Sequence, residues 1–292
     1  MFIDIHVHTR RIPGPPRANG TTYATPDELI RQFDDLGIER AALLRAVSPE
    51  CGYVSESDQE VLDICRAHGG RFIPFCNVDP RAMTNSPDAP LGDILRFYRD
   101  RGCKGVGEVT ANLPFLDPLV QNLFRHVEEV GLPLTFHVAP QIGGVYGLYD
   151  DPGLPQLAES LERFPKLRFL GHSQPFWAEI AALRDPKDRH GYPNYPVEAE
   201  GAVPGLMRRH PNLLGDLSAG SGHNALARDP EYAVGFLNEF QDRLFFGTDI
   251  CAPFQECPLP GFLLGLRDEG KISEEVFRKI ARENAIRLLE SV

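Results

Sequence analysis

Short apolar segments alternate with longer amphipathic segments along almost the whole chain, and this alternation restricts the folds open to it. We predict strands in the apolar segments, which are residues 2–8, 40–46, 71–78, 103–109, 133–138, 167–172, 212–217 and 244–250. We predict helices in the amphipathic segments, which include residues 26–36, 57–67, 91–100, 118–130 and 230–240. The unit recurs about every 35 residues, as in parallel strands joined by helical crossovers. Because eight such units close a (β/α)8 barrel, we expect an α/β fold of the TIM-barrel type.

The connections between the predicted elements differ in length at the two ends of the strands. Helix-to-strand connections are short, whereas several strand-to-helix connections are long, namely residues 9–25, 79–90, 139–153 and 173–203. In a barrel these long segments all lie at the carboxyl ends of the strands, where active sites form. We therefore expect one barrel domain over residues 1–292 with a loop-covered pocket on that face. A helix over residues 273–290 is expected to close the fold.

The charge balance limits the classes of partner. The 292 residues include 30 Lys and Arg against 41 Asp and Glu, which gives a net charge of −11. Nucleic acids and anionic membranes attract a basic excess, so we expect neither as a partner, although a local Arg or Lys could still bind an anionic substrate. The six cysteines form no paired motif, and no apolar run approaches the roughly 20 residues of a membrane span. We expect a soluble cytoplasmic protein, and a homo-oligomer is compatible with the sequence.

The first predicted strand contains the strongest chemical signal, Asp4-Ile5-His6-Val7-His8. Side chains alternate between the two faces of a strand, so Asp4, His6 and His8 are predicted to share one face. The apolar residues between them are then expected to pack outward against helices. Two imidazoles at this spacing near a strand end can bind one metal ion, although structural histidines would give the same pattern.

Four other predicted strands also end in residues that can bind a metal. They contribute Glu108, His137, His172 and Asp249. A buried charge without a partner is costly, so these residues are poor candidates for simple core filling. Imidazole nitrogen and carboxylate oxygen are the donors that zinc accepts, and other divalent ions accept them too. The pattern predicts a divalent metal site, most simply zinc, with a hydrogen-bonded polar core as the alternative.

Further short motifs surround these positions. The segment RFPKL at residues 163–167 leads to Gly171-His172, FGTDI surrounds Asp249, and ENAIRLL lies near the end of the chain. With the His-x-His and Gly-Glu motifs, they resemble the amidohydrolase superfamily over essentially the whole chain. The resemblance is to the branch of TIM-barrel metal-dependent hydrolases related to aminocarboxymuconate semialdehyde decarboxylase.

This resemblance implies a set of metal ligands. His6, His8 and Asp249 would hold the catalytic metal, with His137 as a further ligand. Glu108 lies where related enzymes place a bridging or additional ligand. The decarboxylases of this branch usually lack a Gly-Glu motif here, so the chain departs from their one-metal pattern. One ion and two ions both stay open on the sequence.

The resemblance also implies catalytic roles. A bound metal ion lowers the pKa of water to roughly 7, which provides a nucleophile at neutral pH. Asp249 would accept the proton of that water and return it to the leaving group. His172 would bind the second ion or donate a hydrogen bond to the substrate oxygen that gains charge. The expected activity is hydrolysis of a C–N or C–O bond in a small substrate, and the alternative is decarboxylation.

Two further residues are predicted to contact the substrate. Arg45, near the end of the second strand, could pair with a substrate carboxylate. His223 lies in a glycine-rich segment after the seventh strand, on the same expected face.

Two other interpretations are weaker. Phosphoesterases of the polymerase and histidinol-phosphatase type also begin with His-x-His, but they generally end with an Asp-x-His pair. This chain reads Asp249-Ile250-Cys251 at that point. A barrel with a structural metal and no catalysis is the other interpretation, which the covered pocket and the available proton acceptor disfavour.

Overall fold

The computed structural model describes residues 1–17, 19–52 and 56–292. Eight parallel strands of this part of the chain form a ring, and a ninth, β6 (Leu148–Tyr149), pairs beside β5. The ring strands are β1 (Phe2–Val7), β2 (Ile38–Leu43), β3 (Phe72–Pro74), β4 (Val106–Val109), β5 (Leu134–Ala139), β7 (Phe169–His172), β8 (Leu213–Asp216) and β9 (Leu244–Phe245). Parallel bridges between Cys76 and Val106 and between Val7 and Ile250 join the two sheets into one closed barrel. The predicted (β/α)8 fold is confirmed.

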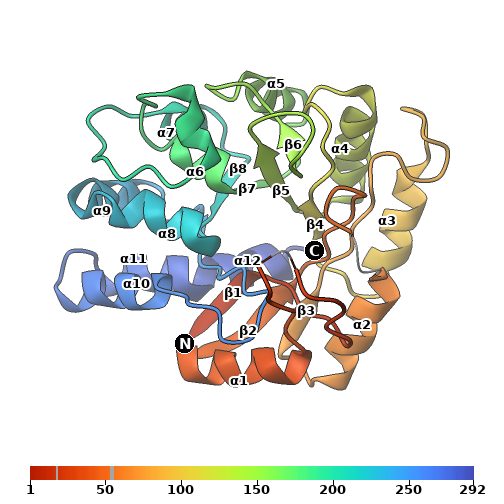
Figure 1. The fold of residues 1–292 in the computed structure, drawn as a ribbon, viewed down its shortest axis with the longest axis horizontal. Coiled ribbons are helices and arrows are strands. Elements are labelled where there is room, and N and C mark those ends of the chain that lie inside the picture. Colours follow the sequence, from red (N-terminus) through yellow and green to blue (C-terminus); the bar gives the residue numbers. More distant parts are fainter. Residues whose placement is uncertain (18, 53–55) are drawn as a thin grey trace.

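The helices surround this ring (Figure 1). They are α1 (Pro26–Leu36), α2 (Asp58–Ala67), α3 (Leu91–Arg99), α4 (Pro118–Val130), α5 (Pro155–Arg163), α6 (Gln174–Ala178), η1 (Pro186–His190), α7 (Ala202–Arg209), α8 (Ala219–Ala227), α9 (Pro230–Glu239), α10 (Leu259–Asp268), α11 (Glu274–Arg278), η2 (Lys279–Glu283) and α12 (Asn284–Glu290). Local sequence signals determine where several of them begin and end. In α1, Thr25 and Glu28 cap each other's backbone N–H groups, Pro26 occupies the first turn, and Gly37 ends the helix at φ 69°.

Several predicted elements differ from the observed ones in extent, such as the strand predicted over residues 71–78, which is regular only at Phe72–Pro74. The last predicted strand, over residues 244–250, is regular only at Leu244–Phe245. Its remainder still bonds to β1, since the Asp249 N–H donates to the His6 carbonyl over 2.8 Å. The predicted terminal helix consists of three consecutive elements: α11, the π-helical turn η2 and α12.

The barrel interior has its own apolar core, which corrects one expectation. Ile3 and Ile5 pack inside with apolar residues of β2, β3, β7, β8 and β9, whereas Val7 belongs to the core shared with the helices. The predicted outward packing of all three is therefore wrong for Ile3 and Ile5. The physical reason is a break in the β1–β2 register between Asp4 and Val7, which interrupts the strict alternation of faces.

The last helix covers one end of the barrel. Ala285, Leu288 and Leu289 of α12 belong to the interior core together with Ile3 and Phe245. Figure 1 shows α12 and the C-terminus near the centre of the ring. The opposite end, at the carboxyl ends of the strands, is left for the long loops. No helix in the described part of the chain is long and apolar enough to cross a bilayer.

Candidate metal centre

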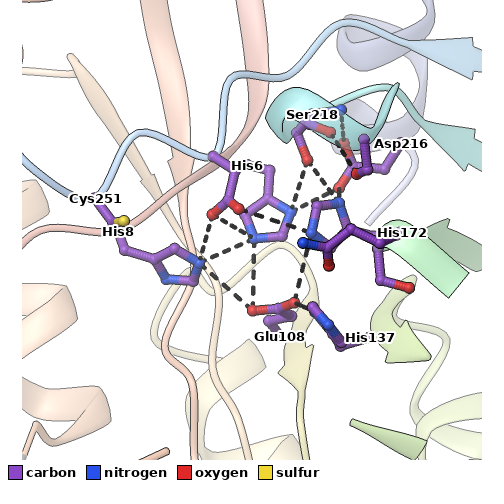
Figure 2. A network of polar contacts seen from close by, with 12 residues as sticks. His6, His8, Glu108, His137, His172, Asp216, Ser218 and Cys251 are labelled. Carbon is purple, nitrogen blue, oxygen red and sulfur yellow. Dashed lines mark hydrogen bonds and ion pairs between the residues drawn. The ribbon is translucent and has the colours of Figure 1, made fainter. Parts of the chain in front are cut away.

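The six predicted ligands meet at the carboxyl ends of five barrel strands, and Figure 2 labels all of them except Asp249. The strands contribute His6 (β1), Glu108 (β4), His137 (β5) and His172 (β7), while His8 directly follows β1 and Asp249 lies in the segment after β9. Five of the six are buried or nearly so, and the Asp249 side chain is 26% exposed. The convergence expected from the sequence is therefore present in the structure.

One oxygen of Glu108 faces the first group of donors. Its Oε2 lies 3.8 Å from His6 Nε2 and 3.6 Å from His8 Nε2. Asp249 Oδ1 lies 3.7 Å and 3.3 Å from the same two nitrogens, which are themselves 3.0 Å apart. A tetrahedral zinc site with ligand bonds of 2.0–2.2 Å has donor–donor edges of roughly 3.3–3.6 Å. The five distances, from 3.0 to 3.8 Å, bracket this range, and His6, His8 and Glu108 form a group that could hold one metal ion.

The other oxygen of Glu108 faces the second group of donors. Its Oε1 lies 2.8 Å from His137 Nδ1 and 3.8 Å from His172 Nε2. Asp249 Oδ2 lies 3.8 Å from the same nitrogen of His172. Glu108 thus divides the donors into two adjacent sets, with one carboxylate oxygen toward each, as Figure 2 shows.

Contacts behind the histidines fix which nitrogen faces the centre. His6 Nδ1 donates to the buried Asp216 carboxylate over 2.6 Å, and His8 Nδ1 donates to the Leu44 carbonyl over 2.9 Å. In their neutral form both rings therefore present an Nε2 lone pair to the centre, whereas without a metal ion the surrounding carboxylates raise the pKa of both imidazoles and favour their protonation. Two such lone pairs 3.0 Å apart repel each other unless a proton or a metal ion lies between them. This arrangement fits a bound cation.

His172 is held in a similar way. Its Nδ1 lies 2.9 Å from the Ser218 hydroxyl, which leaves Nε2 directed toward Glu108 and Asp249. Burial and the neighbouring His6 charge lower the pKa of His172 to about 4. A neutral imidazole at neutral pH is the form that binds a metal ion.

The carboxylates are held in their ionised form. Burial alone would raise the pKa of Glu108, but hydrogen bonds from His137 and His8 and the charges of His137 and His6 hold it well below its usual range. Burial also opposes ionisation of Asp249, and its contact with His8 and the charge of His6 nonetheless lower its pKa. Ionised carboxylates and a neutral His172 suit a divalent cation.

Asp4 has a different place from the one predicted. Its carboxylate accepts hydrogen bonds from the Thr248 hydroxyl over 2.6 Å, from the Thr248 N–H over 3.0 Å and from the His6 N–H over 2.9 Å. It therefore ties β1 to the segment that carries Asp249. Asp4 does not share the face of His6, and instead it positions both neighbouring ligands.

A cavity of about 310 Å³ opens beside the ligands. Its lining includes four of the ligands together with residues of the surrounding loops, which are Arg10, Arg17, Tyr23, Ala46, Glu50, Cys51, Tyr146 and Cys251. The guanidinium groups of Arg10 and Arg17 lie 4.3 Å and 4.9 Å from the centre of the Tyr23 ring. Two guanidinium groups, the Glu50 carboxylate and two aromatic rings therefore border the space next to the candidate metal centre.

The two predicted substrate contacts lie elsewhere. Arg45 pairs with Asp58 over 2.8 Å and lines a separate cavity, because the buried Asp58 carboxylate draws its guanidinium away. His223 lies on α8 with its ring against Phe262. The structure brings neither residue into the lining of the cavity described above.

Sequence reasoning missed several residues around the site. Asp216 ends β8 as a buried carboxylate and so met the criterion that identified the six predicted ligands. Ser218 follows it by two residues. Arg10 and Arg17 lie in the long loop after β1, where only the length of the segment had indicated a functional region.

Solved structures with the same fold cover nearly the whole chain. An uncharacterized TIM-barrel protein from Bordetella bronchiseptica matches at a TM-score of 0.62 and 18% identity, covering 99% of this chain and 98% of that chain. The 5-carboxyvanillate decarboxylase from Sphingomonas paucimobilis matches at a TM-score of 0.64 and 16% identity, with 99% and 98% coverage. A probable 2-pyrone-4,6-dicarboxylic acid hydrolase from Acinetobacter baumannii matches at 0.60 and 14%, with 99% of each chain covered.

Sequence comparison gives the family. No curated protein matches the chain. The family model described as Amidohydrolase matches residues 3–290, which include all six predicted ligands. The chain therefore belongs to the amidohydrolase family of TIM-barrel enzymes.

Proposed function

We propose that this protein is a metal-dependent hydrolase that cleaves a C–N or C–O bond of a small substrate. The observation that carries the proposal is the position of Glu108 between two donor sets, with Oε2 toward His6 and His8 and Oε1 toward His137 and His172. A carboxylate in this position can bridge two metal ions, as in two-metal hydrolytic sites.

The imidazole and carboxylate donors on each side of Glu108 suit zinc. His6, His8 and Asp249 would hold one ion, His137 and His172 would hold the other, and Glu108 would contact both. When bound, such ions supply Lewis acidity and a water of lowered pKa.

Asp249 is the residue best placed to move a proton. Its side chain lines the cavity, and it is the most exposed of the six ligands at 26%. A carboxylate of lowered pKa accepts a proton only briefly, so it can pass the proton to a leaving group. His172 Nε2, 3.8 Å from Asp249 Oδ2, would orient that carboxylate or polarise a substrate oxygen.

The cavity favours a small anionic substrate. Its volume of about 310 Å³ is near the lower end of the range for ligand pockets. Arg10, which also lies 3.9 Å from Glu56, and Arg17 line this cavity together with the Glu50 carboxylate. Planar guanidinium groups of this kind pair well with carboxylates. The acids in the names of the similar decarboxylase and hydrolase, 5-carboxyvanillate and 2-pyrone-4,6-dicarboxylic acid, belong to the same chemical class.

Decarboxylation is the second candidate, and one observation favours it. An arginine-lined cavity beside a metal centre would also hold a carboxylate that leaves as CO₂. The similar structures include two kinds of decarboxylase as well as the hydrolase, so fold similarity does not separate the reactions.

The test is to assay the zinc-loaded protein with a panel of lactones, esters and amides of ring carboxylic acids, together with the free acids. Acid release from the first group without CO₂ supports the hydrolase. CO₂ release from the free acids, with no hydrolysis in the panel, would replace it with the decarboxylase.

A further inference from the structure

A second cavity lies directly beside the one at the metal centre. It measures about 320 Å³, and its polar lining consists of His137, Tyr146, Gln174, Arg189 and His190. Two residues, His137 and Tyr146, line both cavities. The two spaces therefore meet at these side chains.

Tyr146 is the removable part of this shared wall. Its ring stacks on the His137 ring, with centroids 4.6 Å apart and an angle of 54° between the planes. His137 belongs to a barrel strand, whereas Tyr146 belongs to the loop after it and is 43% exposed. The strand thus fixes one half of the wall, and a loop side chain forms the other.

The loop is anchored on both sides of Tyr146. The Asn112 side chain accepts from the Gly143 N–H over 2.6 Å and donates to the Gly147 carbonyl over 3.1 Å, and the Gly147 N–H donates to the Thr110 carbonyl over 2.7 Å. Gly147 has φ 107°, and a Cβ there would lie 2.8 Å from the His137 ring. These contacts fix the backbone on both sides of Tyr146 and keep it close to His137.

The far wall of the second cavity is suited to an anion. Arg189 is 1% exposed, pairs through Nε with Glu179 over 3.0 Å and donates from Nη1 to the Asp150 carbonyl over 2.8 Å. Its Nη2 is buried and has no hydrogen-bond partner among the described residues. The lining contains Gln174 and His190 besides Arg189 and includes no carboxylate. A buried guanidinium nitrogen without an acceptor favours an incoming carboxylate.

We propose that Tyr146 sets the upper limit of substrate length and that the space behind it can recognise a distal carboxylate through Arg189. With Tyr146 in place, a ligand at the metal centre ends within the first cavity. Without its ring, the two cavities join, and a longer diacid reaches the second wall. This inference rests on the proposed function, because it assumes that one carboxylate of the ligand lies in the cavity beside the metal centre.

Binding measurements test this without any turnover. The probes are linear dicarboxylates from malonate to suberate and monocarboxylates of equal chain length, titrated by calorimetry into zinc-loaded protein. In the wild type, we expect no gain in affinity as the diacid lengthens. In Tyr146→Ala, the longer diacids should bind at least about tenfold more tightly than to the wild type, since a hydrogen bond to a charged group is worth about that factor. The monocarboxylates should gain less than about threefold.

Matched variants separate length control from general loosening of the loop. Tyr146→Phe keeps the ring and should keep the wild-type profile. Ile142→Ala removes an exposed apolar side chain from the same loop that lines neither cavity, and it should also behave as the wild type. If alanine at position 146 lowers the zinc content, Tyr146→Val provides the same comparison with His137 still covered.

An unchanged length profile in the alanine or valine variant with normal zinc content would overturn the inference and leave the proposed function standing. An equal gain in affinity for monocarboxylates and dicarboxylates would contradict recognition of the distal carboxylate by Arg189. Failure of the wild type to bind zinc would instead contradict the proposed function.

Discussion

Asp216→Asn should weaken zinc binding without altering any direct ligand. Asp216 Oδ2 accepts from His6 Nδ1 over 2.6 Å, and Oδ1 accepts from the Ser218 N–H over 3.0 Å, so the carboxylate is fixed on both sides. Both Asp216 and His6 are 0% exposed. A charged partner at this position makes the imidazole a better electron-pair donor to a metal ion.

The expected magnitude follows from the chemistry of that contact. A hydrogen bond to a charged group contributes about 1.5–3 kcal/mol, and a neutral acceptor provides roughly half of this. The asparagine oxygen can still accept from His6, so the loss is about 1 kcal/mol or slightly more. We expect the zinc dissociation constant to rise about tenfold, at the lower end of the range for residues behind metal ligands.

The assay is competition for zinc against a chromophoric chelator, with Asp58→Asn as the matched control. Asp58 is also a buried aspartate, 5% exposed, but it pairs with Arg45 outside the cavity. The control should bind zinc as the wild type does. A dissociation constant for Asp216→Asn within about twofold of the control would refute the role assigned to the carboxylate.

Three further predictions address the ligands, the cavity and the pH dependence. His6→Ala and Asp249→Asn should abolish turnover, and His6→Ala should also lower the zinc content; retained rate and zinc in both would mean that the site is assigned wrongly. Arg17→Ala should raise KM for an anionic substrate about tenfold with kcat nearly unchanged, and an equal KM change for a neutral analogue would remove its role in charge recognition. The pKa of His172, about 4 in the folded protein against 6.5, means that the unfolded chain binds the extra proton first. Metal-free protein should therefore lose up to about 3 kcal/mol of stability as the pH falls from 6.5 toward 4, and His172→Gln should remove this loss in urea unfolding. The same slope in the variant would contradict the burial of a neutral imidazole.

The fold followed from the sequence because its signals are local and repeated. Helix α1 begins at Pro26 and ends at Leu36 as predicted, since Thr25 and Gly37 are strong start and stop signals. The predicted strand ends were less accurate. For example, regular strand pairing in β9 ends at Phe245, whereas the predicted strand continued to residue 250. Such departures depend on contacts with β1 that no local pattern contains.

The convergence of the six predicted ligands followed from the topology of the barrel. Polar residues at the ends of parallel strands meet at one edge, whatever their separation in sequence. Asp216 met the same criterion, and applying it to every strand would have found it. The orientation of β1 could not be predicted in full, because the register break that places Ile5 inside the barrel depends on pairing with β2.

The substrate-facing residues were the least predictable part. Arg45 lies close to a strand end, but a buried partner, Asp58, determines where its guanidinium lies. Arg10 and Arg17 reach the cavity from a long loop whose path depends on contacts with Tyr23 and Cys251. Side chains on loops follow such distant contacts, which a single sequence does not reveal.

The most direct test of the metal centre is elemental analysis of the purified protein, in moles of each metal per chain, for the wild type and Glu108→Gln. If Glu108 bridges two donor sets, the zinc-loaded wild type holds two equivalents, and the variant retains one or fewer. The same metal content in the two proteins would contradict the bridging role of Glu108, and a wild type that holds no divalent metal after loading would contradict the metal site itself.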